Sequence, residues 1–391
     1  MLSDLSRELP AALNRLYTAR NEALGRGESI VDLISGNVNQ HGMFFPQELL
    51  AQVMRAALDQ ARVYQPDSLG QEVARQAIAD YYKRAGLCLP AGQILITPGT
   101  SVSYFYCLKL LAEPGDEILC PSPSYPLFET IGRVCGVKLR FYRLLESAHW
   151  EIDLAYLESQ LTTKTRAVVL ISPHNPTGMV ASQEQLEGLA EIACRHHLAI
   201  IADEVFSEFL FDRDCLPRPA STAAPLIFTL NGFSKMFALP GLKLGWVAVS
   251  GDPEWVQKSL STLELISDTF LPVNEMVQFA VPEIFLRGVT FLQIYKAWVK
   301  NCRNTAVEML SQCPLLQLIP PSGGFYLTAR VLGAEKDEGE LAVDLLHKSK
   351  VLVHPGYFYD IPPSHLVMTF VQESQTLQDC LARLCNQLEE K

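Results

Sequence analysis

The residue with the clearest potential for chemistry in this sequence is Lys235. An apolar run with strand composition, residues 226–230, leads to Asn231 and Gly232, where we expect a turn, and Lys235 follows among apolar neighbours. Burial among such neighbours lowers the pKa of a lysine toward the range where its neutral amine is a nucleophile that can form a Schiff base. The alternative is a lysine that extends its amine to water.

Two polar side chains follow other strand-like runs. Asp203 ends the apolar run that begins at Leu198, and Asn175 follows the run 167–172. A carboxylate at the end of such a run is costly to bury unless a cation faces it. Because the carboxyl ends of parallel strands gather at one edge of a sheet, we expect both side chains to lie near a ligand.

A helix start follows the strand-like run 93–97. Gly99, Thr100 and Ser101 open a helix that we expect to continue to Leu111. Small residues at a helix N-terminus present free backbone N–H groups, and the helix dipole adds positive potential, which is typical of a phosphate site. The alternative is that Thr100 and Ser101 are ordinary N-caps.

Five short motifs occur in the order and spacing of one family. They are Thr97-Pro98-Gly99-Thr100-Ser101, Ser172-Pro173-His174-Asn175-Pro176-Thr177-Gly178, Ile201-Ala202-Asp203-Glu204-Val205-Phe206, Ser234-Lys235 and Gly241-Leu242-Lys243-Leu244-Gly245-Trp246. On these residues the chain resembles the class I/II aminotransferases, fold-type I enzymes that use pyridoxal 5'-phosphate (PLP). The resemblance runs from about Ile34 to about Leu384.

The resemblance implies a role in cofactor binding for each matching residue. Lys235 would hold PLP covalently, Asp203 would keep the cofactor ring cationic, and Asn175 would donate to the phenolic oxygen of the ring. Tyr125 would stack on the ring. The expected phosphate ligands are Thr100, Ser101 and Val102.

The same resemblance implies a homodimer with shared active sites. Tyr64 would reach the phosphate in the neighbouring subunit, although a plain surface or core tyrosine is the alternative. Residues 268–270 (Asp268, Thr269, Phe270) are expected to form a loop near the partner's site. The expected substrate-binding residues are Gly36, Asn37, Tyr326 and Val367, with a strand end and turn as the alternative for Gly36 and Asn37.

Three positions depart from the family pattern. Val367 stands where an arginine usually binds the substrate α-carboxylate, and the sequence has no arginine between Arg330 and Arg383. Losing that bidentate contact removes about 1.5–3 kcal/mol. Phe206 stands where a tyrosine hydroxyl usually meets the ring oxygen, and Lys243 replaces a phosphate-binding arginine. We therefore expect a working cofactor site beside a remodelled substrate site.

Three functions are compatible with this pattern. The first is an aminotransferase for a specialised amine, aldehyde or ketone, or for an atypical amino acid. The second is a PLP-dependent lyase, decarboxylase, cyclase or oxidase acting on a specialised amine or amino acid, because all of these reactions share one carbanion. The third is a PLP-binding sensor without catalysis, which would need a DNA-binding helix-turn-helix. The roughly 30 residues before the fold are too few for that motif and are not basic.

The elements that must position these residues alternate between strand and helix. This alternation predicts an α/β fold with a mainly parallel sheet covered by helices on both faces. The resemblance makes it a seven-stranded sheet in a large PLP-binding domain, beside a smaller α+β domain. The expected ranges are 1–47 for an N-terminal arm and part of the small domain, 48–282 for the large domain and 283–391 for the small C-terminal domain. An amphipathic helix is expected up to about residue 30 and a long helix over 291–310.

Composition is that of a globular enzyme. The 391 residues are 48% hydrophobic and 19% charged, and no apolar run is long enough for a membrane span. The net charge of −11 argues against a nucleic-acid partner. Because the first residues lack a basic region followed by an apolar core, we expect a cytoplasmic location. The ten cysteines are scattered, and neither they nor the adjacent His196 and His197 have metal-ligand spacing.

Overall fold

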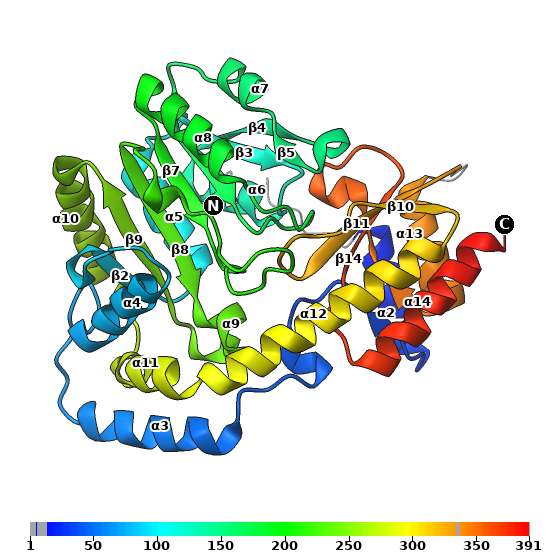
Figure 1. The fold of residues 1–391 in the computed structure, drawn as a ribbon, viewed down its shortest axis with the longest axis horizontal. Coiled ribbons are helices and arrows are strands. Elements are labelled where there is room, and N and C mark those ends of the chain that lie inside the picture. Colours follow the sequence, from blue (N-terminus) through cyan, green and yellow to red (C-terminus); the bar gives the residue numbers. More distant parts are fainter. Residues whose placement is uncertain (1–4, 6–13, 334–336, 391) are drawn as a thin grey trace.

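The structure is a computed structural model that describes residues 5, 14–333 and 337–390 (Figure 1). Its central element is an eight-stranded sheet in the order β2-β9-β8-β7-β6-β3-β4-β5. Strands β4, β3, β6, β7 and β8 are parallel neighbours, β9 runs antiparallel between β8 and β2, and β5 is antiparallel to β4. The strands are β2 (Ile94–Thr97), β3 (Glu117–Ser122), β4 (Lys138–Leu145), β5 (Glu151–Ile152), β6 (Thr165–Ile171), β7 (Ala199–Asp203), β8 (Leu226–Gly232) and β9 (Gly245–Gly251).

The expected α/β fold with a mainly parallel sheet is confirmed, and the strand count exceeds the expected seven by β5. This strand has two residues and pairs with the end of β4 at the sheet edge. A two-residue strand is too short to carry a hydrophobic alternation, so the sequence pattern does not reveal it. All five residues of β7 are buried, as in a parallel strand that is covered on both faces.

Helices cover both faces of the sheet (Figure 1). One face carries α5 (Thr100–Leu111), α6 (Leu127–Cys135) and α10 (Pro253–Phe270), and the other carries α7 (Leu154–Ser159) and α8 (Gln183–His196). A third group packs together beside β2, namely α3 (Gln47–Gln60), α4 (Glu72–Arg84) and α11 (Glu275–Arg287). The short helices are α9 (Phe233–Met236), η1 (Val38–His41), η2 (Ala91–Gln93), η3 (Glu146–Ala148), η4 (Pro219–Ser221), η5 (Pro240–Leu242) and η6 (Gly356–Tyr359).

The C-terminal part of the chain builds a second, antiparallel sheet in the order β10-β11-β14-β13. Its strands are β10 (Leu316–Leu318), β11 (Tyr326–Val331), β13 (His354–Pro355) and β14 (His365–Thr369), and its helices are α12 (Val289–Gln312), α13 (Glu338–Ser349) and α14 (Ser374–Glu389). The N-terminal helix α2 (Arg15–Gly25) packs against α13, and β1 (Val31–Asp32) pairs with β12 (Val351–Leu352). Residues 15–32 and the C-terminal part of the chain thus belong to one α+β unit.

Several local expectations change in the structure. Asn231 and Gly232 do not form a turn, because they are the last residues of β8 and pair with β9. Residues 268–270 are not a loop, because α10 continues to Phe270. The long helix is confirmed as α12. Of the amphipathic N-terminal helix the structure describes α2, and residues 1–4 and 6–13 lie outside the described residues.

The division at 47/48 and 282/283 stays a prediction. Its second boundary lies inside α11, which packs on α3 and α4. In the residues that the structure describes, no single helix is long and apolar enough to cross a membrane, and only α11 and α12 together, bent by 71° at their junction, have the length and composition for it.

Candidate active site

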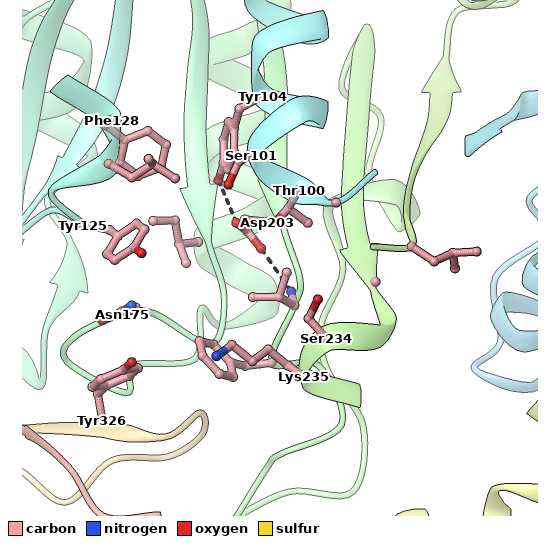
Figure 2. Close-up of a pocket in the computed structure, with 17 residues that line it drawn as sticks. Thr100, Ser101, Tyr104, Tyr125, Phe128, Asn175, Asp203, Ser234, Lys235 and Tyr326 are labelled. Carbon is pink, nitrogen blue, oxygen red and sulfur yellow. Dashed lines mark hydrogen bonds between the residues drawn. The ribbon is translucent and has the colours of Figure 1, made fainter. Parts of the chain in front are cut away.

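A cavity lies at the carboxyl ends of the central parallel strands (Figure 2). Strands β6, β7 and β8 all end there, which is where open α/β sheets bind their ligands. Helix α5 begins at the same place, and β11 of the smaller sheet closes one side. The lining residues are Gly99, Thr100, Ser101, Tyr104, Tyr125, Leu127, Phe128, Ile171, Asn175, Asp203, Val205, Phe206, Gly232, Ser234, Lys235, Leu244 and Tyr326.

Lys235 extends into this cavity from the short helix α9. Its Nζ donates a hydrogen bond to the carbonyl oxygen of Gly36 at 2.9 Å and lies 5.8–5.9 Å from the ring centres of Phe325 and Phe206. Burial lowers the pKa of the lysine to about 8. A larger fraction of neutral amine is therefore present near neutral pH than for a lysine in water, as a nucleophile or a general base requires.

Asp203 is the last residue of β7 and faces neutral donors. It accepts a hydrogen bond from the Tyr104 hydroxyl at 2.9 Å and another from the backbone N–H of Val205 at 3.1 Å (Figure 2). Burial raises the pKa of the carboxyl to about 6. Within the described part of the chain no salt bridge reaches Asp203. A cationic ligand group would therefore supply the charge that this carboxylate lacks.

The N-terminus of α5 presents the expected anion site. Gly99 precedes the helix without a side-chain cap, so Thr100 and Ser101 stand in the first turn and line the cavity instead of capping it. Val102 does not line the cavity, because its backbone N–H bonds to the carbonyl of Gly99 and its side chain packs into the core beneath α5. The open helix end is suited to a phosphate.

Close backbone packing brings that helix end to the strand ends. A Cβ atom on Gly245 of β9 would lie 2.9 Å from the Cα of Gly99 and 3.0 Å from the carbonyl oxygen of Asn231. Only glycine fits between these two backbones. The approach sets the start of α5 beside the end of β8, and Lys235 follows three residues after that end.

Asn175 and Tyr125 complete the polar part of the wall. Asn175 follows β6, and its buried Oδ1 has no hydrogen-bond partner. A buried polar atom without a partner indicates a ligand group. Tyr125 follows β3 and keeps 42% of its surface exposed toward the opening. In Figure 2, Tyr125, Asn175 and Tyr326 lie on one side of the cavity and Thr100 and Ser234 on the other.

Some of the expected site residues lie outside this lining. Gly36 is present through its carbonyl, and a Cβ atom there would lie 2.5 Å from the Tyr326 hydroxyl. Asn37 and Lys243 are not among the lining residues, and the Lys243 side chain is exposed after η5. Tyr64 is 72% exposed, away from the cavity of this chain. Their roles stay predictions.

Val367 is not among the lining residues either. It is 1% exposed in β14, paired with Thr328 on one side and His354 on the other. Phe206, by contrast, does line the cavity and packs against Phe325 and Tyr326 with ring centres 4.8 and 6.3 Å away. An apolar ring thus stands where the family pattern carries a hydroxyl.

Sequence reasoning missed several lining residues. Tyr104, which donates to Asp203, lies one helical turn after Thr100, and that i,i+4 spacing is a signal that could have identified it. Phe128 lines the cavity from α6, and its ring meets the Tyr104 ring edge-on at 5.0 Å. Its sequence context carries no comparable signal.

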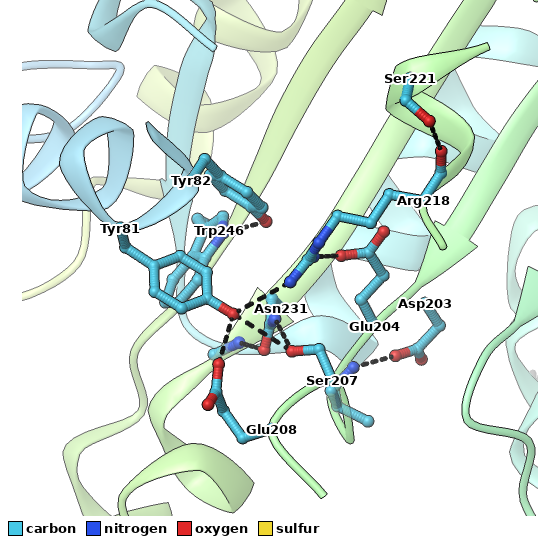
Figure 3. A network of polar contacts seen from close by, with 12 residues as sticks. Tyr81, Tyr82, Asp203, Glu204, Ser207, Glu208, Arg218, Ser221, Asn231 and Trp246 are labelled. Atoms are coloured by element: carbon cyan, nitrogen blue, oxygen red, sulfur yellow. Dashed lines mark hydrogen bonds and ion pairs between the residues drawn. The ribbon is translucent and has the colours of Figure 1, made fainter. Parts of the chain in front are cut away.

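A buried polar network behind Asp203 was also missed (Figure 3). Glu204, the residue after Asp203, forms an ion pair with Arg218, and both side chains are buried. Arg218 also donates to the Tyr81 hydroxyl at 3.3 Å, which donates to Glu208 at 2.9 Å. The network ties the end of β7 to α4, so it supports the position of Asp203.

The cavity fits PLP, the cofactor that the resemblance implies. The phosphate would be held at Thr100 and Ser101 and the protonated ring nitrogen at Asp203, and the side-chain NH2 group of Asn175 would donate to the phenolic oxygen. Lys235 would supply the amine for covalent attachment.

Comparison with known proteins agrees with this geometry. The family model "Aminotransferase class I and II" matches residues 28–384. The chain is 30% identical to the glutamate-pyruvate aminotransferase AlaA of Haemophilus influenzae over 367 residues, which covers 92% of this chain and 90% of that protein. It is 31% identical to the alanine aminotransferase of Mycobacterium bovis over 397 residues, with 98% and 91% covered.

Solved structures show the same fold. The alanine aminotransferase from Pyrococcus furiosus superposes with a TM-score of 0.93 at 24% identity, with both chains covered in full. An aminotransferase from Escherichia coli superposes with a TM-score of 0.87 at 27% identity, covering 100% of this chain and 98% of that one. The chain therefore belongs to the class I and II aminotransferases and is a PLP-dependent transferase of fold type I.

Proposed function

We propose that this aminotransferase acts on a specialised amine, aldehyde or ketone, or on an atypical amino acid, because its pocket lacks the usual arginine for an α-carboxylate. The observation that carries the proposal is the environment of Val367. This apolar side chain is 1% exposed and stands between Thr328 and His354, at the position where the family pattern carries the arginine.

The charges around the cavity support the proposal. Among the lining residues that the structure describes, Lys235 is the one basic side chain and Asp203 the one acidic side chain. A substrate carboxylate bound in this cavity away from Lys235 would lose its hydration without gaining a positively charged partner. The missing charge-assisted contact amounts to about 1.5–3 kcal/mol.

The residues at the strand ends have roles that fit transamination. Bound PLP supplies an electron sink that stabilises negative charge at the substrate carbon. Asp203 keeps a positive charge on its partner atom, Thr100 and Ser101 hold the anionic group, and Lys235 moves a proton at Nζ as general base and then acid. These residues do not depend on the remodelled side of the cavity.

We also propose a homodimer with shared active sites. Tyr64 is exposed beside a groove lined by Leu58, Pro272 and Val273, and Phe270 and Leu271 nearby are 60% and 68% exposed. Exposed apolar side chains gathered in this way are typical of an interface. Sedimentation of the PLP-loaded protein should give a dimer, and a fully active monomer would contradict the proposal. The expected cytoplasmic location stays a prediction.

Half-reactions of the purified protein test the function. The PLP-loaded protein is mixed with single amines and amino acids, without an acceptor, while the visible absorbance of the cofactor is recorded. We expect pyridoxamine phosphate to accumulate with selected amines, and glutamate, aspartate and alanine to react weakly. Product formation without pyridoxamine phosphate would indicate a lyase, decarboxylase, cyclase or oxidase instead. Saturation by glutamate, aspartate and alanine at ordinary concentrations would contradict the specialised substrate.

A further inference from the structure

Near Tyr326 of the cavity wall, three side chains form an array in which His354 and Tyr359 are buried and Tyr17 is half-buried. Tyr17 and Tyr359 flank His354, with the Tyr17 hydroxyl 2.9 Å from Nε2 and the Tyr359 hydroxyl 3.0 Å from Nδ1. The three residues come from α2, η6 and β13. Since His354 pairs with Val367 across the small sheet, the array stands beside the position at which the arginine is missing.

Tyr359 connects this array to the cavity wall. Its carbonyl oxygen accepts a hydrogen bond from the backbone N–H of Ser124 at 2.8 Å. Ser124 directly precedes the lining residue Tyr125. Burial, and then the nearby phenols of Tyr326 and Tyr125, raise the pKa of Tyr359. Tyr125 and Tyr326 line the cavity, whereas Tyr359 is 4% exposed and lies next to that lining. The Tyr326 hydroxyl also meets the backbone of Gly36, whose carbonyl oxygen accepts the hydrogen bond from Lys235.

Among the residues that the structure describes, no basic side chain lines this side of the cavity. His354 is neutral near pH 7, because burial lowers its pKa to about 4. Burial is the main cause that raises the pKa of Tyr17, and the nearby carboxylate of Asp32 raises it further. Arg20 acts in the opposite direction and lowers it. Asp32 accepts the N–H groups of Ile34 and Ser35 at 2.7 and 3.0 Å, and in the described ranges no salt bridge includes it.

A neutral imidazole between two phenols can be satisfied in two ways. It carries one N–H and one acceptor nitrogen, so one tyrosine donates to His354 and the other accepts from it. With the proton on Nδ1, Tyr359 accepts and its own O–H is free to donate. With the proton on Nε2, Tyr359 donates to His354 and its oxygen is free to accept. The array therefore adapts to a ligand group that donates or accepts a hydrogen bond without charge.

We propose that Tyr326 and Tyr359, positioned by His354 and Tyr17, form an uncharged hydrogen-bonding subsite that selects substrates with a neutral polar group beside the reacting carbon. The inference rests on the proposed aminotransferase function and names the substrate class: amino amides, amino alcohols and the related amines or carbonyl compounds. A carboxylate would meet phenols and the nearby Asp32 instead of an arginine.

Matched substrate pairs test the selection directly. Alanine and alaninamide have nearly the same shape and differ in charge, and phenylalanine with phenylalaninamide repeats the comparison on a larger side chain. In the half-reaction of the wild-type holoenzyme we expect kcat/KM to be up to about tenfold higher for the amide of a pair, which corresponds to the free energy of one hydrogen bond between neutral groups.

The Tyr359→Phe variant tests the residue. Removing the hydroxyl should raise KM for the amide about tenfold, leave kcat nearly unchanged and leave the acid of each pair unaffected. Tyr357→Phe is the matched control, because Tyr357 is 50% exposed in the same helix η6. Tyr359→Phe also removes a partner of the buried His354, so its thermal melting should be somewhat lower than that of Tyr357→Phe. A higher KM for the amide with an unchanged KM for the acid and equal cofactor absorbance separates a contact with the substrate from a structural effect.

The possible outcomes distinguish the inference from the function on which it rests. If the acids react as well as the amides, or if Tyr359→Phe leaves the KM for the amide unchanged, the proposed subsite is wrong. The proposed aminotransferase function is not affected by either result. The same holds if neither member of any pair reacts while a plain amine such as benzylamine is converted. If no amine converts the cofactor, the proposed function itself is wrong.

Discussion

The cavity has two different sides: charged groups lie at the strand ends of the large sheet, and uncharged groups lie on the side of the small sheet. On the strand-end side, Lys235 and Asp203 are buried with shifted pKa values, and an open helix N-terminus adds positive potential. On the small-sheet side, the polar group in the wall is the phenol of Tyr326, and the buried Tyr359 and neutral His354 lie behind it. The cofactor side is thus built around charge, and the substrate side is built without it.

This difference shows that the two sides are constrained by different chemistry. A phosphate and a cationic ring need fixed charges in fixed places, and those charges come from the rigid ends of buried strands. The substrate side carries no such demand, since its strands β11, β13 and β14 belong to a separate sheet. Its residues can change and leave the cofactor site unaltered. The predictions below address first the charged side and then the uncharged one.

The largest effect is expected on the charged side from Lys235→Ala. Loss of the amine removes covalent attachment of PLP and the general base, so transamination should fall by about 10⁴-fold or more. Half-reaction rates and the visible absorbance of the protein measure this. Lys300→Ala, an exposed lysine on α12, is the control and should change neither. Activity within tenfold of the wild type would remove Lys235 from the chemistry.

The next largest effect concerns the support of the charged side, in the Arg218→Met variant. This change leaves Glu204 buried without its ion-pair partner, which typically costs about 3–5 kcal/mol of unfolding free energy. Denaturant unfolding of the cofactor-free protein measures the loss. Arg213→Met, on the exposed part of the same loop, should be nearly neutral. Recovery in the double variant Glu204→Gln/Arg218→Met would identify the unpaired charge as the cause.

Asp203 should make the stability of the cofactor-free protein depend on pH. Because burial raises its pKa from 3.8 to about 6, the folded state holds this proton more tightly than the unfolded state. The stability that protonated Asp203 contributes is full below about pH 4 and is lost as the pH rises through 6, by about 3 kcal/mol.

The Asp203→Asn variant removes that dependence. Without cofactor it should unfold at a higher denaturant concentration than the wild type at pH 7, and the two proteins should converge near pH 4. Asp59→Asn, exposed on α3, serves as the control. A cofactor-free Asp203→Asn protein that is less stable than the wild type at pH 7 would mean that the carboxylate already has its charge partner within the protein.

The residues that the structure brings together on the charged side follow strong local patterns in the sequence. Lys235, Asp203 and Asn175 all follow apolar strands, and the glycine and hydroxyl residues before α5 mark a helix start. These signals depend on a few neighbouring residues. Tyr104 was missed although its helical spacing from Thr100 was readable.

On the uncharged side the sequence predicted Tyr326, which lines the cavity, and the missing arginine at Val367, but not the residues behind them. Tyr17 lies 337 residues before His354 in the sequence. Neither periodicity nor a short motif relates it to His354 and Tyr359. The same holds for Glu204 and Arg218, which are buried together although the sequence places Arg218 in a proline-rich loop. Contacts of this kind follow from the packing of distant elements, which a local pattern does not contain.

The smallest effect is expected on the uncharged side from Val367→Arg. A charge-assisted contact contributes about 1.5–3 kcal/mol, and burying a guanidinium where valine is 1% exposed offsets much of it. We expect a net gain of about 1 kcal/mol, or about fivefold in KM for alanine, and a loss for alaninamide. Half-reaction rates with the two compounds measure it. Val367→Met supplies a long side chain without charge and should not favour alanine. If both variants improve alanine equally, the shape of the pocket and not its missing charge excludes carboxylates, and the contrast between the two sides would have to be restated in terms of volume.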